Sequence, residues 1–393
     1  MQSRMTSEQI AQSLGSLRGW IESNDYCGYE PSDGNLSPLH ALTFEVPLLE
    51  QILQQVIWKS PVDIRRLVRV PRHRSTKGMG YMAWGYTTLY QLTGSDSDRE
   101  RATFCLNWLL QNRSPHHAEY CWGDSFPFSS RGGRRPAFEP TIVWSSLIGQ
   151  TFLDAQQVIQ NDEYSKVASS ICSWIKKLPR NRQDHGLCLG YTALGKSTVH
   201  NSNMLGAAFL ARAGTLTGDP EALDLAAHAM EYSCTHQREN GSWFYAEASR
   251  HHWIDSFHTG YNLDSLRGYM QTTGDQQYEP NLRRGFDFFK AHFFERDGRP
   301  KYYHNKTYPI DIQCASQAIE TLTRFADYDR EALELAQRVA DWTVSNMQDR
   351  DGHFYYRDLG WKKVKTPMFH WGQATMFRAL ASLLSSLQNR GSV

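Results

Sequence analysis

The sequence lacks the features that mark secreted and membrane-spanning chains. It contains no run of about 18 apolar residues, the length that crosses a bilayer as a helix. Its first residues, MQSRMTSEQIAQSLGSL, lack the apolar core of a secretion signal. The seven cysteines are scattered, odd in number and without a C-x-x-C pair, which disfavours a disulfide framework and a cysteine zinc site. We therefore expect a soluble, cytoplasmic protein whose thiols are reduced.

The sequence also lacks a charge excess and the short motifs of several enzyme classes. Its formal net charge is +1, a balance that favours neither nucleic acid nor an acidic membrane surface as a partner. It has no G-x-x-x-x-G-K-[ST], no G-x-G-x-x-G after a strand, no H-E-x-x-H and no G-x-S-x-G. Nucleotide hydrolysis, dinucleotide redox chemistry, zinc proteolysis and serine hydrolysis therefore lose support. No cofactor or metal is expected, because no histidine pair is spaced to bind a metal from one helix.

Aromatic residues, by contrast, are abundant and make up 12% of the 393 residues. At this density they either fill cores or line grooves that stack on flat ligand faces. The balanced net charge does not exclude an anionic ligand, because local clusters such as Arg131, Arg134 and Arg135 could bind it.

A phrase of turn residues, a glycine and aromatic or apolar residues recurs along the chain. Its copies are QDHGLCLGY, QRENGSWFY, RDGRPKYY and QDRDGHFYYR, and CWGDSFPF at 121–128 is a weaker copy. The glycines are Gly186, Gly241, Gly298 and Gly352, which are 55, 57 and 54 residues apart. Turns of this kind followed by aromatics predict short strands or hairpins in loops.

A helical, small-residue-rich pattern follows each phrase. The polar residues that head these patterns are Lys77, Glu139, His200, His258, Gln313 and His370. More polar amphipathic patterns alternate with them, near 38–58, 97–112, 163–178, 220–236, 279–294 and 330–347. Six such helical hairpins predict an all-α (α/α)6 toroid, with the apolar helices inside and short β-hairpins in the loops. We expect one domain over 1–393, with residues 1–25 as a peripheral helix or extension, and a funnel where the inner helices begin.

The strongest candidate for chemistry is the phrase DSFHTGY, at 255–261. His258 would stand at the start of an inner helix, where the positive end of the helix dipole favours a neutral imidazole that can act as a base. Asp255 and Ser256 could instead be helix caps, with His258 bonded to a neighbouring loop. The tyrosines that could complete a proton pair with His258 are Tyr245, Tyr261 and Tyr302.

Other polar and aromatic residues of the same loops would bind substrate. In VHNSNM, His200, Asn201 and Asn203 could bind sugar hydroxyls, although Asn is also a common helix cap. Arg250 or Arg357 could hold a carboxylate. The remaining expected substrate-binding residues are Glu139, Trp122, Asp255, Asp311, Gln313, Tyr303, His370 and Trp371.

Several longer phrases resemble a known family. These are GYEPSDGNLSPL, VHNSNMLGAA, QRENGSWFY, DSFHTGYNLDSL and YPIDIQCASQAIETL. They are similar to the VpsJ-like proteins of bacterial exopolysaccharide and capsule biosynthesis, from Tyr26 to about Leu384. The segments HTGYNLDSLRGY and ASQAIETL also resemble helices of the heparan and heparosan glucuronyl C5-epimerases. The resemblance implies a polysaccharide ligand and association with the machinery that makes it.

These observations favour an enzyme that modifies an anionic, uronic-acid-containing polysaccharide or oligosaccharide, most of all a uronosyl C5-epimerase. That reaction needs a base and an acid on opposite faces of the sugar, and a cation near its carboxylate. A glycoside hydrolase or a polysaccharide lyase is the alternative on the same fold. A hydrolase would use two carboxyls among Glu139, Glu247, Asp255 and Asp311. The third hypothesis is a non-catalytic glycan-binding component of exopolysaccharide biosynthesis.

Overall fold

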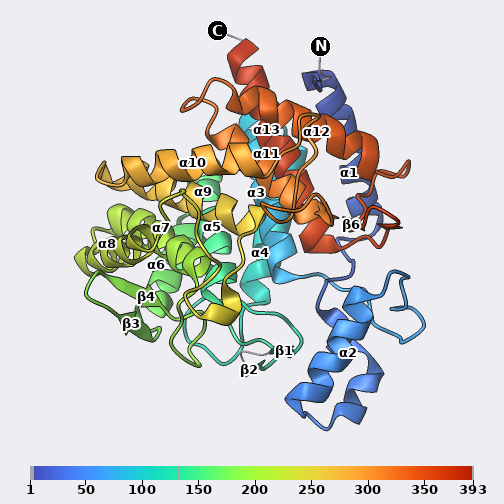
Figure 1. Ribbon diagram of the computed structural model, residues 1–393, viewed down its shortest axis with the longest axis horizontal. Helices are drawn as coiled ribbons and strands as arrows, with labels where there is room; N and C mark the ends of the chain where they lie inside the picture. The colour runs from blue at the N-terminus through green and yellow to red at the C-terminus, as the bar shows by residue number, and fades with distance from the viewer. Residues whose placement is uncertain (1–3, 131–132, 392–393) are drawn as a thin grey trace.

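The computed structural model describes residues 4–130 and 133–391 and consists mainly of α-helices (Figure 1). Arg131, named above as part of an arginine cluster, lies outside the described residues. No helix among the described residues combines the length and the hydropathy needed to cross a bilayer.

Six helices form a closed inner ring. They are α3 (Thr76–Thr93), α5 (Ile142–Ile159), α7 (His200–Thr217), α9 (Ser256–Thr273), α11 (Ile312–Arg324) and α13 (Thr375–Gly391). Each packs against the next, and α13 packs against α3. Several begin at a side-chain cap: the side chains of Ser75, Thr141, Asp255 and Asp311 each accept a backbone N–H of the first turn. This ring confirms the predicted α/α toroid.

Outer helices pack against the inner ones. They are α4 (Asp96–Gln111), α6 (Asp162–Lys176), α8 (Pro220–Thr235), α10 (Glu279–His292) and α12 (Ala332–Met347), each packed on the inner helix that precedes it. The sixth outer helix is α1 (Ser7–Ser23), which packs on α13. Its buried stripe of Ile10, Leu14, Leu17 and Ile21 recurs at helical spacing. The first helix thus closes the ring against the last one.

The segment 38–58, expected to be an outer helix, has a different place. It forms η2 (Pro38–Thr43) and α2 (Pro47–Lys59), which pack mainly on η1 (Asp33–Leu36), on β1 and on each other. Figure 1 shows α2 projecting from the helical ring at the lower right. The physical reason is that the inward stripe of α2 includes Glu50 and Gln54, which suit polar loop partners better than an apolar ring.

Each glycine of the repeated phrase lies against the backbone of an outer helix. Gly186, Gly241 and Gly298 approach residues of α8, α10 and α12, respectively. Gly352 approaches α1, and a Cβ built on it would lie 2.3 Å from the carbonyl oxygen of Ser16. Its φ of 103° is also one that residues with a Cβ rarely adopt. The repeat therefore marks the contact between each turn and the outer helix of the following hairpin.

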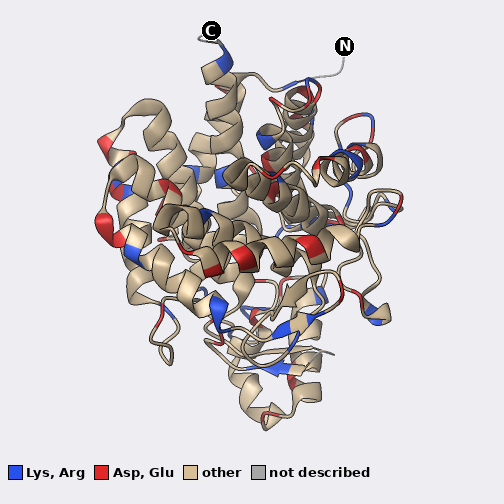
Figure 2. Ribbon diagram, turned by 90° about the vertical axis from the view of Figure 1, so that its left-hand side faces the viewer, with Lys and Arg blue, Asp and Glu red and all other residues tan. Residues whose placement is uncertain are grey.

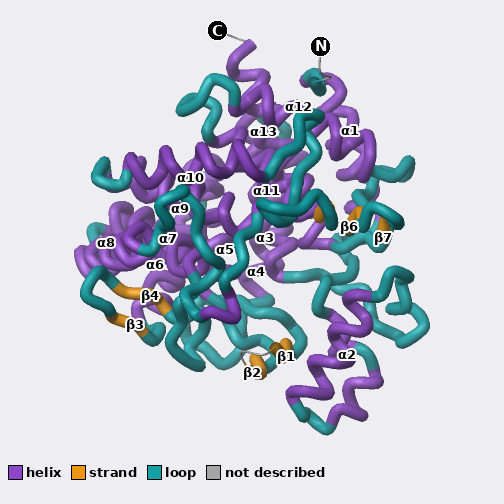
Figure 3. Tube along the Cα trace, in the orientation of Figure 1, coloured by secondary structure: helices purple, strands orange, loops and turns teal. Residues whose placement is uncertain are grey.

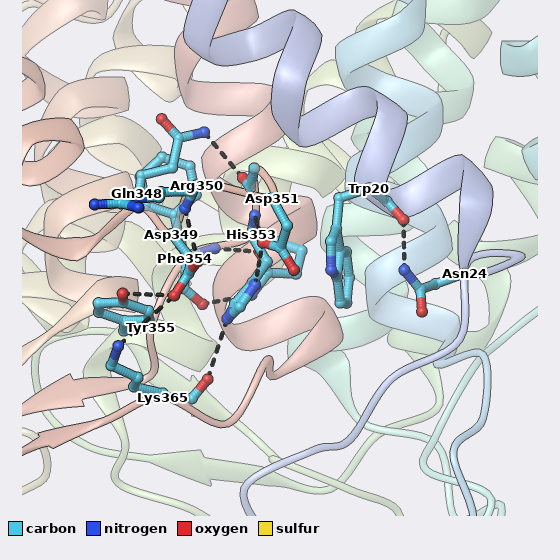
Figure 4. A network of polar contacts seen from close by, with 12 residues as sticks. Trp20, Asn24, Gln348, Asp349, Arg350, Asp351, His353, Phe354, Tyr355 and Lys365 are labelled. Atoms are coloured by element: carbon cyan, nitrogen blue, oxygen red, sulfur yellow. Dashed lines mark hydrogen bonds and ion pairs between the residues drawn. The ribbon is translucent and has the colours of Figure 1, made fainter.

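A glutamine reinforces this contact in two of the repeats. Gln237 donates from its amide to the carbonyls of Gly241 and of Asn281 in α10. Gln348 donates in the same way to the carbonyls of Gly352 and of Ser13 in α1. Figure 4 shows Gln348 and the turn that follows it beside Trp20 of α1. The shared pattern identifies α1 as the equivalent of α10 in the ring.

The strands are short and lie in the loops outside the helical ring (Figure 3). Two antiparallel pairs are β1 (Phe128–Ser130) with β2 (Gly133–Arg135), and β3 (Arg180–Arg182) with β4 (Leu187–Leu189). A third antiparallel sheet has the order β5 (Ile310–Asp311), β6 (Arg357–Asp358), β7 (Lys363–Val364). The loops also contain η3 (Ser249–His251) and the π-helical turn η4 (Phe369–Ala374), which leads into α13. The predicted β-hairpins in the loops are thus present.

Closure of the ring at Gly352 can be tested by substitution. We expect Gly352→Ala to lower the free energy of unfolding by about 3 kcal/mol or more, because the new methyl group meets backbone atoms of α1 and φ is strained. Gly274→Ala is the matched control, since Gly274 also has a positive φ of 73° but open space around its Cβ position. It should cost only about 1 kcal/mol. Urea unfolding measures both values, and equal losses would contradict the close packing of the turn.

Candidate active site

The starts of the six inner helices bring one set of side chains together. These are Lys77 of α3, Trp144 of α5, Asn201 of α7, His258 of α9, Gln313 of α11 and His370 of η4. Ring contacts connect several of them: Trp144 lies 6.5 Å from His370, and Phe257 lies 5.4 Å from Trp371 and 3.9 Å from His258 between ring centroids. We call this set, with the loop residues around it, the funnel.

His258 is held by Asp255 at the start of α9. Asp255 accepts hydrogen bonds from the backbone N–H of His258, 3.0 Å away, and from Trp253, and its second contact with His258 is at Nδ1, 2.7 Å away. Asp255 is therefore both the helix cap and the partner of the imidazole. Nε2 of His258 has no hydrogen bond within the described chain. The side chain is 20% exposed, so His258 is not sealed within the core.

His370 forms a second pair of the same kind with Glu30. Glu30 binds the backbone N–H of His370 at 3.0 Å and its Nδ1 at 2.5 Å. Burial alone would raise the pKa of Glu30, but the charge and hydrogen bonds of His370 lower it below its ordinary value. Nε2 of His370 is buried and has no partner among the described residues. A buried unpaired imidazole nitrogen is costly, and a bound ligand or water would satisfy it.

His200 and Asn203 contrast with these two histidines because their polar atoms are all occupied. Nε2 of His200 bonds Glu247 at 2.7 Å, and its Nδ1 bonds Ser233. Asn203 accepts from the backbone of Leu189 and donates to the carbonyl of Ala229 and to Ser233. The bonds of both residues therefore tie α7 to its neighbours. Asn201 differs, since its Oδ1 has no partner in the described chain and it lines a narrow cleft with Tyr245 and His258.

Lys77 was named from the sequence only as the head of a helical pattern, with no chemical role. Its ammonium lies 5.3 to 5.7 Å from the ring centroids of Trp144, Tyr81 and Tyr261. Burial lowers its pKa to about 8, although Glu30 and Asp124 oppose that shift. No ion pair of Lys77 is found in the part of the chain that the structure describes. A lysine in the first turn of a helix opposes the helix dipole, and that misplaced charge was the available sequence signal.

A second cation, Arg135, enters the funnel from β2. It forms an ion pair with Asp124 at 2.8 Å and lies over the ring of Trp144. Burial raises the pKa of Asp124, and Arg135 only partly opposes this shift. Arg134, the next member of the predicted cluster, points elsewhere and binds Glu50 of α2.

Tyr245 stands beside His258 on one wall of the funnel. Its ring lies 4.7 Å from that of His258 and stacks on Trp253 at 4.6 Å. Burial raises the pKa of Tyr245 above its ordinary value, so the phenol remains protonated at neutral pH. Tyr261 lies deeper, where its hydroxyl bonds Tyr81 at 2.7 Å and receives a hydrogen bond from Gln313 at 2.9 Å. Tyr245 is therefore the tyrosine better placed for a ligand.

Asp311 organises the neighbouring part of the funnel, at the start of α11. It accepts hydrogen bonds from Arg357 at 2.5 Å, from Trp371 at 2.8 Å and from the backbone of Gln313 at 2.9 Å. Arg357 in turn lies over the ring of Tyr302, which is tilted against that of Tyr303 with their centroids 4.6 Å apart. Asp311 is thus fully engaged in holding Trp371 and Arg357. The Oε1 atom of Gln313 is buried and has no partner within the described residues.

Three of the expected binding residues lie apart from these contacts. Arg250 is exposed on η3, Trp122 is fully buried and donates to the carbonyl of Leu109, and Glu139 is half-buried in the loop before α5. Trp122 thus belongs to the core. Across 4–130 and 133–391, no three His, Cys, Asp or Glu side chains are grouped closely enough to hold a metal ion.

Comparisons with known proteins bear on the fold. No family model and no curated protein sequence matches the chain. Among solved structures, the cellobiose 2-epimerase of Bacillus thermoamylovorans is 11% identical, with a TM-score of 0.63 over 82% of this chain and 90% of that one. A family 88 glycosyl hydrolase of Bacteroides vulgatus is 10% identical, with a TM-score of 0.63 over 98% and 100%. A heparin-specific unsaturated glucuronyl hydrolase is 12% identical, with a TM-score of 0.57 over 81% and 87%. These likenesses establish the α/α toroid fold, which carbohydrate-active enzymes of several kinds share.

The buried charge of Lys77 should lower the free energy of unfolding of the protein. We expect Lys77→Met to raise the free energy of unfolding by about 1–3 kcal/mol below pH 8, where folded and unfolded states both carry the charge. Because folding lowers the pKa from 10.5 to about 8, the folded state loses its proton first as the pH rises. The gain should therefore shrink between these two values and vanish above 10.5. Urea unfolding across this pH range measures the difference between Lys77→Met and the parent chain, with Lys166→Met at an exposed position as control. A lower stability of Lys77→Met than of the parent below pH 8 would contradict the prediction.

Proposed function

We propose that the protein is a carbohydrate-active enzyme that epimerises a uronate residue of an anionic saccharide at C5. The observation that carries the proposal is the presence of two imidazoles, His258 and His370, from different hairpins of the ring. Each is bonded to a carboxylate through Nδ1, and each leaves Nε2 without a protein partner among the described residues. This arrangement holds the imidazole in one orientation, and with the Nδ1 proton directed at the carboxylate, Nε2 is the atom that can accept a proton.

C5 epimerisation needs two proton-transferring groups on opposite faces of the sugar ring. One imidazole takes the proton from C5, and the electron pair moves into the adjacent carboxylate to form an enolate-like intermediate. The other imidazole, protonated, returns a proton to the opposite face of C5, and the carboxylate is restored. No oxidant or reductant is consumed, so the two histidines and solvent suffice for the proton balance. Tyr245, beside His258, is the alternative proton donor on that side.

Lys77 supplies the cation that this reaction requires. Its ammonium is buried, lacks an ion pair within the described chain and is mostly protonated at neutral pH, because its pKa is about 8. A substrate carboxylate would neutralise this charge, and the negative charge that develops on the intermediate would be stabilised more strongly still. The rings of Trp144, Tyr245 and Trp371 offer flat surfaces for pyranose faces. Asn201, with its free Oδ1, could bind a hydroxyl.

A glycoside hydrolase is the second candidate, and one observation favours it. Burial raises the pKa of Asp124 while the partner of His370, Glu30, has a lowered pKa, and such opposed carboxyls suit acid and base roles. Of the carboxyls proposed from the sequence, Asp255, Asp311 and Glu247 are each bonded to a histidine, an arginine or a tryptophan, as Asp124 and Glu30 are. Glu139 differs, because its Oε1 is buried and has no partner among the described residues. The solved structures of similar fold include both epimerases and hydrolases, which supports either class.

Deuterium exchange tests the first candidate. The protein is incubated in D₂O with a panel of uronate-containing oligosaccharides and with cellobiose, and deuterium at C5 or C2 is measured by mass spectrometry and NMR. We expect incorporation at C5 of a uronate, without change in chain length. His258→Asn and His370→Asn should lower its rate by roughly a hundredfold to ten-thousandfold, because each removes one proton-transferring group. His228→Asn, on the exposed side of α8, is the matched control and should retain the activity.

Other outcomes separate the alternatives. Shortened oligosaccharides that depend on Asp124 would establish the hydrolase. Exchange at C2 of cellobiose would show that the imidazoles act on a neutral sugar. If oligosaccharides bind and neither exchange nor cleavage occurs, the protein is a glycan-binding component.

A further inference from the structure

The segment 38–69, here called the apolar lobe, exposes large hydrophobic side chains to an unusual degree. It holds ten of the sixteen exposed large hydrophobic residues of the described chain. These ten are Leu39, Leu42, Phe44, Val46, Leu48, Leu49, Ile52, Val56, Val62 and Leu67. Soluble monomers rarely gather so many exposed apolar side chains in one place unless the surface binds something. The lobe projects from the ring, so these side chains lie on a protruding part of the molecule (Figure 1).

Helix α2 within the apolar lobe carries an apolar stripe on its outward face, while its inward face mixes the polar Glu50 and Gln54 with the buried Ile57. Leu48, Ile52 and Val56 recur at a spacing of four residues and are exposed, whereas Glu50 and Gln54 are buried. Glu50 binds Ser129, Arg134 and His40, so the inward orientation of the polar stripe is fixed by several hydrogen bonds. A surface helix of a globular protein normally has the opposite arrangement. The buried hydrogen bonds of Glu50 therefore fix the orientation that exposes the apolar stripe.

The turn before α2 adds a strained apolar tip. Phe44 and Glu45 adopt φ values of 49° and 56°, a conformation that bulky residues rarely take. Phe44 is 79% exposed as a result. Local strain of this kind persists where it has a function, and here it accompanies an exposed aromatic ring.

The charges of the apolar lobe are biased toward free cations. Over the molecule as a whole both signs are interspersed (Figure 2). In the apolar lobe, however, the exposed acids are paired, Glu45 with Arg134 and Asp63 with Arg65. Lys59, Arg66 and Arg69 form no ion pair within the described residues. Exposed apolar side chains flanked by free cations suit the interface of an anionic bilayer.

We propose that the apolar lobe docks on an anionic lipid surface, with Phe44 and the outward stripe of α2 inserted among the lipids. A second copy of the chain suits this face less well, because two such surfaces would bring their own free cations together. The lobe also adjoins the funnel: α2 packs on β1, whose partner β2 carries Arg135, and Trp58 of α2 donates to Tyr356 at 2.6 Å. If the proposed function holds, docking would keep the funnel beside glycans attached to that surface.

Vesicle flotation tests this inference without any need for catalysis. The full chain is mixed with phosphatidylcholine vesicles that contain or lack phosphatidylglycerol, and the protein that floats with the lipid is measured. We expect binding to the anionic vesicles and much weaker binding to the neutral ones. A variant with Phe44→Ser, Leu48→Ser and Ile52→Ser should bind on the order of a hundredfold more weakly. Arg66→Glu with Arg69→Glu should bind at least about tenfold more weakly, and raised salt should have the same effect.

Matched controls use exposed apolar residues outside the apolar lobe. Leu216→Ser with Trp361→Ser removes two exposed apolar side chains at other places and should leave flotation unchanged. His258→Asn should also float like the parent chain, so failure of the proposed function does not affect this test. Circular dichroism shows whether each variant is folded. Absence of flotation with anionic vesicles would overturn the proposal, as would a dimer in sedimentation velocity that only the triple serine variant disperses.

Discussion

The contact between each glycine turn and the outer helix of the next hairpin is the constraint on which the rest of the structure depends. At Gly241 and Gly352 there is no room for a side chain, since backbone oxygens lie 2.2 and 2.3 Å from the Cβ positions. Gln237 and Gln348 then bond the same turn to that helix. Because the last of these contacts is made to α1, the ring closes. A closed ring brings the starts of all six inner helices to one opening.

Closure also explains how so many polar groups can be buried together. His258 and His370 begin different hairpins, and each is held by a carboxylate at the same nitrogen. Their partners come from different places: Asp255 is the local cap of α9, whereas Glu30 is 340 residues away in sequence. Lys77 remains without a carboxylate in hydrogen-bond contact among the described residues, and its lowered pKa reflects that imbalance. A site that is short of one anion is complementary to an anionic ligand.

The sequence supported the fold more fully than the site. The spacing of the glycines and the apolar helices predicted six hairpins because both features follow local rules of turn and helix formation. The sequence pattern predicted the sixth outer helix at 38–58, whereas the structure has α1 in that place. An amphipathic stripe predicts a helix but not the surface against which the helix packs. His258 and Asp255 could be paired from their spacing of three residues on one helix turn. The pairing of His370 with Glu30, and the isolation of Lys77, depend on closure and had no local signal beyond an unfavourably placed lysine.

The net charge of the sequence also gave less information than the distribution of charges in the folded chain. A balance of +1 argued against an acidic surface as partner, yet the folded chain pairs the exposed acids of the apolar lobe and leaves Lys59, Arg66 and Arg69 free. Local sequence patterns were enough to predict the six hairpins, their turns and most of the residues that begin the inner helices, because these follow from contacts between near neighbours in the chain. The exception is Glu139, which lies in the loop before α5. Which histidines keep a free nitrogen, and which face of α2 points outward, became known from the folded chain alone. Both depend on partners that are distant in sequence and that meet only when the ring is closed.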